Sequence, residues 1–153
     1  MAVDLAVEDV TLSAAVQRQL RTEIGRMVRA AAQRDSRADY EVSVRFVADV
    51  EIQALNLAYR KKNKPTDVLA FAQREGPGGA LHPSVLGDIV ISIDTARRQA
   101  RRGLYRELLH LASHGLCHLL GYDHRNDAEE RTMNTRAAAL RDEAGRRGRI
   151  RAA

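Results

Sequence analysis

The stretch HLASHGLCHLLGYDH, residues 110–124, determines the local fold and contains four of the five histidines of the chain. His114 and His118 are four residues apart, so on a helix they project from one face, about 6 Å apart along the axis. Gly121 permits a sharp reversal at the end of that helix, and His124 can then return as a third ligand. Three histidines with an open fourth position are typical of a catalytic zinc ion. The stretch therefore predicts a helix and a following turn that together hold one metal ion.

The spacing H-x-x-x-H-x-x-G-x-x-H is that of the metzincin metalloproteases, with one departure. The protease form carries a glutamate directly after the first histidine, where it activates the metal-bound water. Gly115 occupies that position here. Without the carboxylate a peptidase lacks its proton acceptor. The sequence therefore keeps the metal ligands and argues against peptide hydrolysis.

Two neighbouring side chains are expected to lie outside the metal site. His110 extends the histidine stripe, but it lies about 12 Å along the helix axis from His118, too far for the two rings to share one ion. We expect His110 to be buried or to support a ligand. Cys117 is expected to be a buried helix cysteine, with a thiolate ligand as the alternative. A histidine pair at this spacing often binds no metal, and the third histidine behind a glycine is what favours the metal site.

Apolar periodicity outside this stretch predicts an α+β domain. EVSVRFV (41–47) alternates apolar and polar residues and predicts a strand. Residues 11–32 repeat apolar positions at three and four, which predicts a helix capped by Thr11 or Ser13. The same patterns predict strands over 3–7, 68–72 and 89–93, helices over 50–59, 95–120 (with a break at Gly103) and 126–144, and a Gly/Pro loop over 76–83 that contains His82.

The order of these elements predicts a mixed sheet of about four strands packed with helices, in a single domain over residues 1–145. Residues 146–153 form an Arg-rich tail that we expect to be disordered. The length of 153 residues suits one domain, and 44% apolar with 29% charged residues is the balance of a globular protein. One cysteine excludes a disulfide framework. No membrane span and no secretory signal are visible, so we expect a cytoplasmic protein with no membrane partner.

The charge of the chain suits a polyanionic partner. Its formal net charge is +5, and the basic residues are arginines apart from three lysines within residues 61–64. Arginine binds phosphate bidentately, although an arginine bias from a GC-rich genome would give the same composition. Arg97, Arg98, Arg101 and Arg102 cover one side of a helical turn, either as a guide for a polyanion or as an ordinary solvated face.

Three segments resemble the YbeY family of bacterial single-strand endoribonucleases. HGLCHLLGYDH (114–124) is similar to the family signature. YRKKNKPTDVLAF (59–71) is similar to the family's YR-x(3)-KPTDVLSF segment, with Ala70 in place of the usual serine, and LGDIVIS (86–92) resembles the strand before the long helix. The segments stand in the family's order and together cover about residues 55–130.

The resemblance implies a zincin-like fold, one metal ion (usually zinc) and cleavage of single-stranded RNA. It places the metal on His114, His118 and His124, at the long helix and the following turn. Catalysis is assigned to His114 and to Arg60, which takes the place of the family's functional arginine.

The resemblance also implies the substrate and the partners. It places the RKKNK loop near the metal, so Lys61, Lys62 and Lys64 are expected to bind RNA. Family members act in ribosomal RNA maturation, notably at the 3′ end of the small-subunit 16S RNA, and in ribosome quality control. The expected partners are therefore single-stranded RNA, ribosomal RNA and ribosome-associated factors.

Phosphodiester cleavage leaves both the nucleophile and the base open. Negative charge accumulates on the phosphoryl oxygens, where a metal ion and an arginine can stabilise it. Either the RNA 2′-OH or a metal-activated water attacks the phosphorus. Asp88 and Asp123 are the candidate bases, and Asp123 can instead orient a histidine ligand by accepting its second N–H.

Two other functions compete with RNA cleavage. One is metal-dependent hydrolysis of a peptide or small ester, which the zincin spacing suggests and Gly115 opposes. The other is a ribosome-associated RNA-binding factor whose metal ion is structural. Three histidines without a fourth protein ligand argue against this last function.

Overall fold

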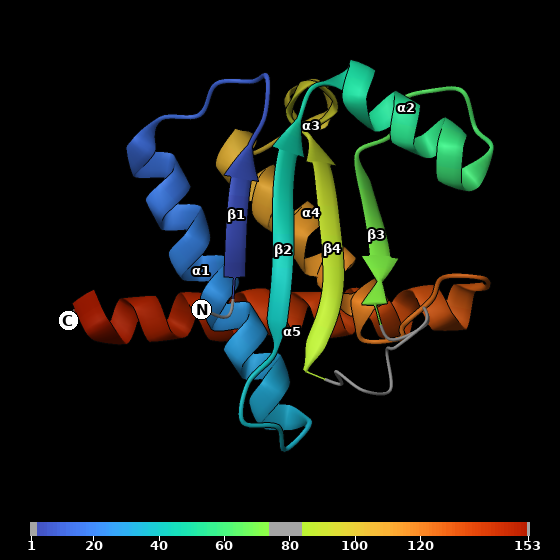
Figure 1. Cartoon of the computed structure of the whole chain (residues 1–153). Helices are drawn as coiled ribbons and strands as arrows, with labels where there is room; N and C mark the ends of the chain where they lie inside the picture. The colour runs from blue at the N-terminus through green and yellow to red at the C-terminus, as the bar shows by residue number, and fades with distance from the viewer. Residues whose placement is uncertain (1–2, 74–83, 153) are drawn as a thin grey trace.

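A mixed sheet organises the structure, a computed structural model that describes residues 3–73 and 84–152, with residues 146–152 described by their backbone alone. The sheet has the order β1-β2-β4-β3 (Figure 1). β1, β2 and β4 run parallel, and β3 pairs antiparallel with β4 at one edge. The strands are Val3–Val7 (β1), Glu41–Val47 (β2), Val68–Ala72 (β3) and Val85–Ser92 (β4). The α+β class and the four strands predicted from the sequence are confirmed.

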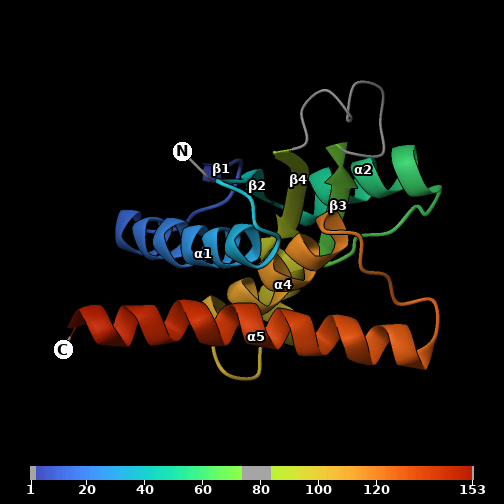
Figure 2. The same ribbon diagram turned by 90° about the horizontal axis from the view of Figure 1, so that it is seen from below.

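The helices form two further layers on one face of the sheet and one helix on the other (Figures 1 and 2). On the first face lie α1 (Ala14–Arg34) and α4 (Leu104–Leu119), and α5 (Asp127–Ala152) crosses their outer side. α2 (Asp49–Arg60) packs Ile52 against Leu69 and Val90 on the opposite face. α3 (Ile93–Gln99) joins β4 to α4. Within the described part of the chain, no helix combines the length and apolar character needed to cross a bilayer.

Several element boundaries differ from the sequence prediction. The helix expected over 95–120 is two helices, α3 and α4, with Gly103 between them at φ +93°. β4 begins before the apolar run 89–93 and ends at Ser92, because the Ser92 hydroxyl accepts the N–H of Thr95 and caps α3. α5 continues to Ala152, so residues 146–152, which we expected to be disordered, have a helical backbone. The loop with His82 lies outside the described residues.

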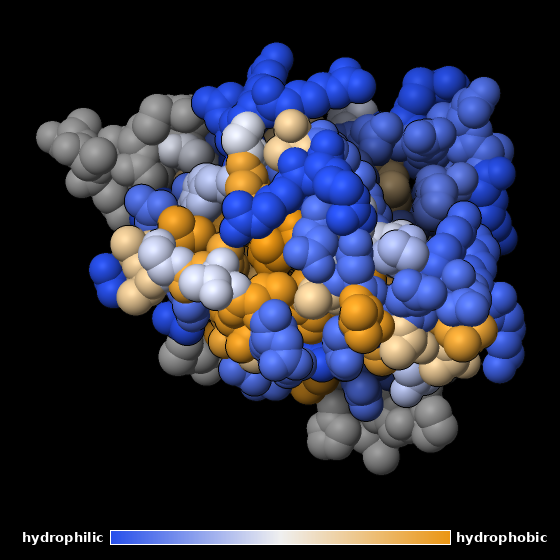
Figure 3. Space-filling view, turned by 90° about the horizontal axis from the view of Figure 1, so that it is seen from above, coloured by the Kyte–Doolittle hydropathy of each residue, from blue (hydrophilic) through white to orange (hydrophobic). Residues whose placement is uncertain are grey.

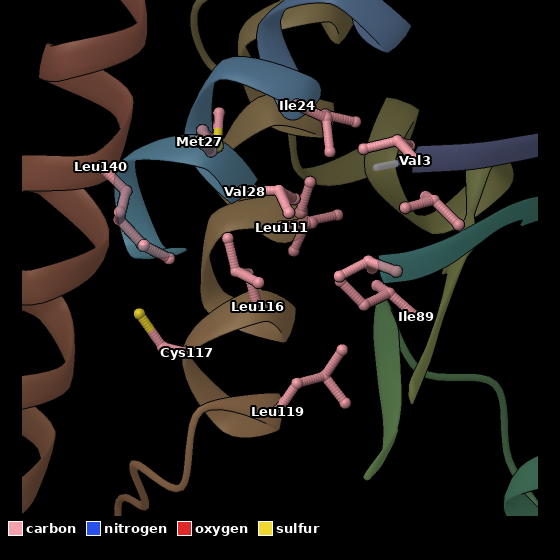
Figure 4. Close-up of a cluster of buried hydrophobic side chains, with 14 of the residues drawn as sticks. Val3, Ile24, Met27, Val28, Ile89, Leu111, Leu116, Cys117, Leu119 and Leu140 are labelled. Carbon is pink, nitrogen blue, oxygen red and sulfur yellow. The ribbon is translucent and has the colours of Figure 1, made fainter. Parts of the chain in front are cut away.

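The main core lies between the sheet and the helices that cover its first face (Figure 4). α4 occupies its centre. Leu116 and Leu119 of α4 are almost completely buried, and Ile89 faces this helix from β4. Cys117 points the other way, toward α5 and Leu140. Because α4 contacts the sheet on one side and α5 on the other, its position is fixed by the core rather than by its own helix propensity.

Gly115 lies on the side of α4 that packs against Ile89 of β4. A Cβ atom built on Gly115 would lie 2.8 Å from the Ile89 Cγ2 atom and 3.2 Å from Cδ1 and Cγ1. Such separations are shorter than carbon–carbon contacts in packed interiors, so a side chain would require the helix or Ile89 to move. The glycine in the histidine motif therefore has a packing role that its sequence position does not reveal.

We predict that Gly115→Ala lowers the free energy of unfolding by about 1 kcal/mol. The overpacking cost of about 1–3 kcal/mol exceeds the helix-propensity gain of up to about 1 kcal/mol. Gly25 in α1 is the matched control, because a Cβ there meets only the Arg29 Nη1 atom, at 3.8 Å. Gly25→Ala should therefore leave stability unchanged or raise it. Urea unfolding measures both variants, and equal stability changes at the two glycines would contradict this prediction.

Candidate metal centre and cleft

A cleft of about 650 Å³ lies where α4, β3, the end of α2 and the start of α5 meet. α4 contributes the floor with Leu111, Gly115 and His118, which are spaced by four and three residues and so share one face. The remaining lining residues used below are Arg60, Lys62, Lys64, Asp67, Ala70, His110, His114, His124, Glu130, Asn134 and Arg141. All four histidines of residues 110–124 therefore border one cleft.

The turn after α4 brings His124 back to His118. Gly121 has φ +101°, a conformation that favours glycine. The Gly121 N–H donates to the His118 carbonyl and the Tyr122 N–H to the Cys117 carbonyl, each at 3.0 Å. These two bonds are the pair found in the Schellman motif at a helix C-terminus. The His118 and His124 rings meet edge to face, with centroids 5.1 Å apart.

Asp123 joins these two histidines in a group that suits a metal ion. His118, Asp123 and His124 each offer one ligand atom, and these atoms lie within 4.8 Å of one another. The backbone N–H of His124 donates to the Asp123 carboxylate at 2.7 Å and lowers the pKa of Asp123, with Arg125 adding a smaller effect. Imidazole nitrogens with a carboxylate oxygen are a donor set for zinc and similar divalent ions. The donor chemistry therefore fits one divalent cation.

The pKa of His118 is lowered, chiefly by burial and then by electrostatic repulsion from His124, with Arg60 adding to the effect. A lowered pKa favours the neutral imidazole, which is the form that binds a metal ion. The environment of His118 thus prepares it for ligation.

The His114 ring is directed toward α5 rather than toward the group of His118, Asp123 and His124. Its Nδ1 atom lies 2.9 Å from the His110 carbonyl oxygen and its Nε2 atom 2.9 Å from the Asn134 Oδ1 atom. A neutral imidazole has a single N–H and can donate to only one of these two oxygens, so when Nδ1–H donates to the His110 carbonyl, the Asn134 amide must turn to direct its Nδ2–H at Nε2. The structure thus gathers His118 and His124 with Asp123 and holds His114 against α5. Asn134 was not identified from the sequence, because no local pattern links it to the histidines.

His110 lies beside His114 rather than beside His118. The His110 and His114 ring centroids are 4.3 Å apart, and burial, followed by repulsion from His114, lowers the pKa of His110. Its carbonyl oxygen accepts from His114 and from the Ser113 hydroxyl. The main chain of His110 therefore orients His114.

The end of α2 and the loop after it supply Arg60, Lys62 and Lys64 to the cleft, and α5 supplies Arg141. Arg60 donates from Nη2 to the Ala70 carbonyl oxygen at 3.4 Å, which ties the helix end to β3. Lys61 follows with φ +61° as the C-cap. Lys62 and Lys64 line the cleft, whereas Lys61 is absent from its lining.

Buried Asn56 holds this lysine loop in place. Its Nδ2 donates to the Lys64 carbonyl at 2.9 Å, and only 2% of the residue is exposed. This is a second positioning residue that the sequence did not indicate, because its partner lies in the following loop.

Asp88 does not reach the cleft. It pairs with Phe71 of β3, and Phe71 packs against the α2-side cluster. Because strand side chains alternate, Asp88 faces the side of the sheet opposite to Ile89 and α4. Asp88 therefore cannot act on a substrate bound at the histidines, which removes one of the two candidate bases.

Cys117 is confirmed as a buried helix cysteine. It is fully buried, points toward α5 (Figure 4), and burial raises the pKa of its thiol to about 11. The thiol is therefore protonated at neutral pH and turned away from the histidines, so it supplies no metal ligand.

The outer surface near the lysine loop is polar. Seen from above, hydrophilic residues cover most of the right-hand side of the molecule, where Figure 1 places α2 and the segment after it, and hydrophobic residues gather nearer the centre (Figure 3). The end of α2 itself also exposes Leu57 and Tyr59 beside Arg60.

Comparison with known proteins gives one consistent result. A family model described as Endoribonuclease YbeY matches residues 6–145. The Endoribonuclease YbeY of Bacillus subtilis is 40% identical over 153 residues, covering 94% of this chain and 98% of its own. Those of Oceanobacillus iheyensis (45% identity, 80% and 86% covered) and Syntrophotalea carbinolica (48%, 67% and 71%) are also similar.

A solved structure supports the fold alone. The solution structure of TM1509 from Thermotoga maritima superimposes with a TM-score of 0.64, at 24% identity, over 97% of this chain and 93% of that protein. The arrangement of sheet and helices described above is thus a known one.

We predict that His118→Ala abolishes binding of a divalent ion, measured as metal per chain after loading with zinc and gel filtration. Comparing His114→Ala with Asp123→Asn identifies the third ligand. If His114 turns from Asn134 onto the ion, His114→Ala loses the metal and Asp123→Asn weakens binding by about 10–100-fold, as loss of an orienting partner does. If instead Asp123→Asn loses the metal and His114→Ala only weakens binding, the third ligand is Asp123. Full metal content in His118→Ala would contradict the site itself.

Proposed function

This chain belongs to the Endoribonuclease YbeY family, and on that premise we propose that it is a metal-dependent endoribonuclease that cleaves single-stranded RNA. The observation that carries the proposal is the meeting of Arg60 with the His118 and His124 pair in one cleft. Phosphodiester cleavage needs positive charge at the phosphoryl oxygens, and these elements supply a cation beside a metal-binding group.

Separate residues are proposed to bind the metal ion and to stabilise the phosphoryl charge. We assign the metal to His118 and His124, with His114 or Asp123 as the third ligand, and zinc as the ion suited to nitrogen and carboxylate donors. When bound, a divalent ion supplies Lewis acidity toward a phosphoryl oxygen or an activated water. Arg60, tethered at Ala70, directs its remaining N–H groups to the developing phosphoryl charge.

The cleft carries more positive than negative side chains. Among the described residues, Arg60, Lys62, Lys64 and Arg141 line it against two carboxylates, Asp67 and Glu130. The Asp67 carboxylate accepts from the Val68 N–H and from Gln99, so its charge is partly engaged by the protein. The balance favours a polyanion, and Lys62 and Lys64 are proposed to contact RNA phosphates outside the scissile bond.

With Asp88 on the far side of the sheet, Asp123 is the remaining predicted carboxylate at the histidines. Glu130 at the start of α5 is a further carboxylate in the cleft that the sequence did not suggest. We assign proton transfer to one of these two groups, with the RNA 2′-OH or water as the nucleophile. The product distinguishes the nucleophiles, because attack by the 2′-OH leaves a cyclic phosphate.

The biological setting is proposed from the family. We propose that the substrate is ribosomal RNA in the cytoplasm, at the 3′ end of small-subunit 16S RNA, together with a role in ribosome quality control and contacts with ribosome-associated factors. The charge of the cleft supports an RNA substrate, and the named assignments rest on family membership.

The test compares three substrates with the zinc-loaded chain: a single-stranded RNA, the same RNA in a duplex, and a mixed peptide library. We expect cleavage of the single strand alone, and none by His118→Ala. Peptide turnover would instead favour a hydrolase of the peptidase kind. RNA binding without turnover by either protein would favour an RNA-binding factor with a structural metal ion.

We predict that Arg60→Ala lowers the rate of RNA cleavage by about 10²–10³-fold, the loss seen when a donor to developing negative charge is removed. Metal content and melting temperature should stay unchanged, because Arg60 is exposed and makes one long hydrogen bond. Single-turnover kinetics at saturating RNA measure the chemical step.

Two matched variants complete that experiment. Lys62→Ala should raise KM with little change in kcat, as expected for a residue that contacts RNA away from the scissile bond. Arg18→Ala removes an exposed arginine of α1 outside the cleft and should change neither constant. If Arg60→Ala affects KM alone, Arg60 positions the substrate and does not stabilise the reaction.

A further inference from the structure

A second hollow, of about 540 Å³, adjoins the cleft. His110 and Arg141 line both, so these two residues form the boundary between them. We call this second space the arginine hollow, because its lining includes Arg101, Arg102, Arg106 and Arg141. They come from three places in the chain: the α3–α4 connection, the first turn of α4, and the middle of α5.

Among the residues that the structure describes, little negative charge faces the arginines of this hollow. Arg101, Arg102 and Arg106 are exposed, and none of them forms an ion pair with a carboxylate in the described part of the chain. Glu107 also lines the hollow, and its Oε2 atom accepts from the Gln99 side chain at 2.7 Å. Four guanidinium groups therefore face one carboxylate that already has a hydrogen-bond donor.

Arg141 is a fixed cation at the junction. It is half-buried, and its Nη1 donates at 2.6 Å to the hydroxyl of Ser113, which is completely buried and donates in turn to the His110 carbonyl. Burial lowers the pKa of Arg141, but a guanidinium remains charged at neutral pH. The same His110 carbonyl accepts from His114. One hydrogen-bonded chain thus connects the junction to the histidines of the cleft.

An RNA strand that is bound in the cleft can also reach the arginine hollow. Arg106 and His118 are on the same helix, and their separation corresponds to about 18 Å along the axis. A single strand that passes the metal site covers this distance in several nucleotides. Of the described residues, His110 is the one aromatic side chain that lines the hollow, so its chemistry suits phosphates rather than stacked bases.

We propose that the arginine hollow is a second binding site for the phosphate backbone of single-stranded RNA, continuous with the cleft at Arg141. The path of the RNA strand in this proposal rests on the proposed function. The choice of phosphate as the ligand rests on the arginines that form no ion pair. The hollow binds RNA on the side of the histidines that is opposite to the lysine loop, and so lengthens the contact with the substrate. Its arginines recognise the backbone and carry no information on base sequence.

Binding is measured first, with the full chain in a chelator so that no RNA is cleaved, on a single strand of about 12 nucleotides, within the range that single-strand-binding sites cover. Arg101→Ala/Arg102→Ala should weaken binding about tenfold near 0.1 M salt. It should also reduce the slope of log K against log salt by about 1.4, at about 0.7 for each phosphate contact with a single strand.

The matched control removes the same charge elsewhere. Arg18 and Arg29 are exposed on α1 and line neither the cleft nor the arginine hollow, so Arg18→Ala/Arg29→Ala should leave the slope unchanged. Arg101→Lys/Arg102→Lys keeps the charge and should retain most of the slope. Equal losses in the α1 control and the hollow variant would overturn the proposal in favour of a general charge effect.

Cleavage then separates this proposal from the proposed function. With zinc bound, a trinucleotide too short to span both sites should be cleaved equally by wild type and Arg101→Ala/Arg102→Ala, while KM for the longer strand should rise about tenfold in the variant. Chains that bind the longer strand with the expected slopes and cleave nothing would refute the proposed function and keep the hollow. Unchanged binding of the longer strand, or a larger loss of affinity for polyglutamate than for RNA, would overturn the hollow as an RNA site.

Discussion

The contact between Gly115 and Ile89 is the constraint on which the geometry of the site depends. It sets how closely α4 lies on β4 and which face of the helix borders the cleft, since Leu111, Gly115 and His118 all lie on that face. A side chain at position 115 would require α4 or Ile89 to move. Where α4 moves, His118 shifts relative to β3, whose Ala70 carbonyl accepts from Arg60. The spacing between the histidines and the arginine is therefore a consequence of helix-on-sheet packing.

The parts of the fold that could be predicted from the sequence are those with a local physical cause. The strand at 41–47 follows from strict alternation, and the break at Gly103 and the turn at Gly121 follow from backbone conformations that favour glycine. Boundaries set by tertiary contacts were misplaced. β4 begins at Val85 because it pairs there with Glu41 of β2, a partner more than forty positions away in the chain that no local pattern reveals. The helical backbone of α5 likewise continues past the apolar positions that suggested its end.

The same division applies to the site. The approach of His118 and His124 was predictable, because six residues and one glycine turn determine it. The partner of His114 was not, since Asn134 belongs to α5 and meets α4 only through packing of the two helices. Asp88 was a candidate base that lies on the wrong face of the sheet. It is next to Ile89 in sequence, but alternation places the two side chains on opposite faces. Alternation along this strand is by itself sufficient to exclude Asp88 from the face that α4 covers.

Gly115 also explains why this site is not one substitution from a peptidase. In the metalloprotease motif the residue after the first histidine carries the carboxylate that activates water. Here a Cβ atom at that position would lie 2.8 Å from the Ile89 Cγ2 atom, so a glutamate would require α4 or Ile89 to move. It would also place negative charge in a cleft whose balance favours phosphate. Packing and electrostatics thus both oppose a glutamate at position 115. A proton acceptor must instead come from outside the helix, and we propose Asp123 in the following turn or Glu130 at the start of α5 for this role.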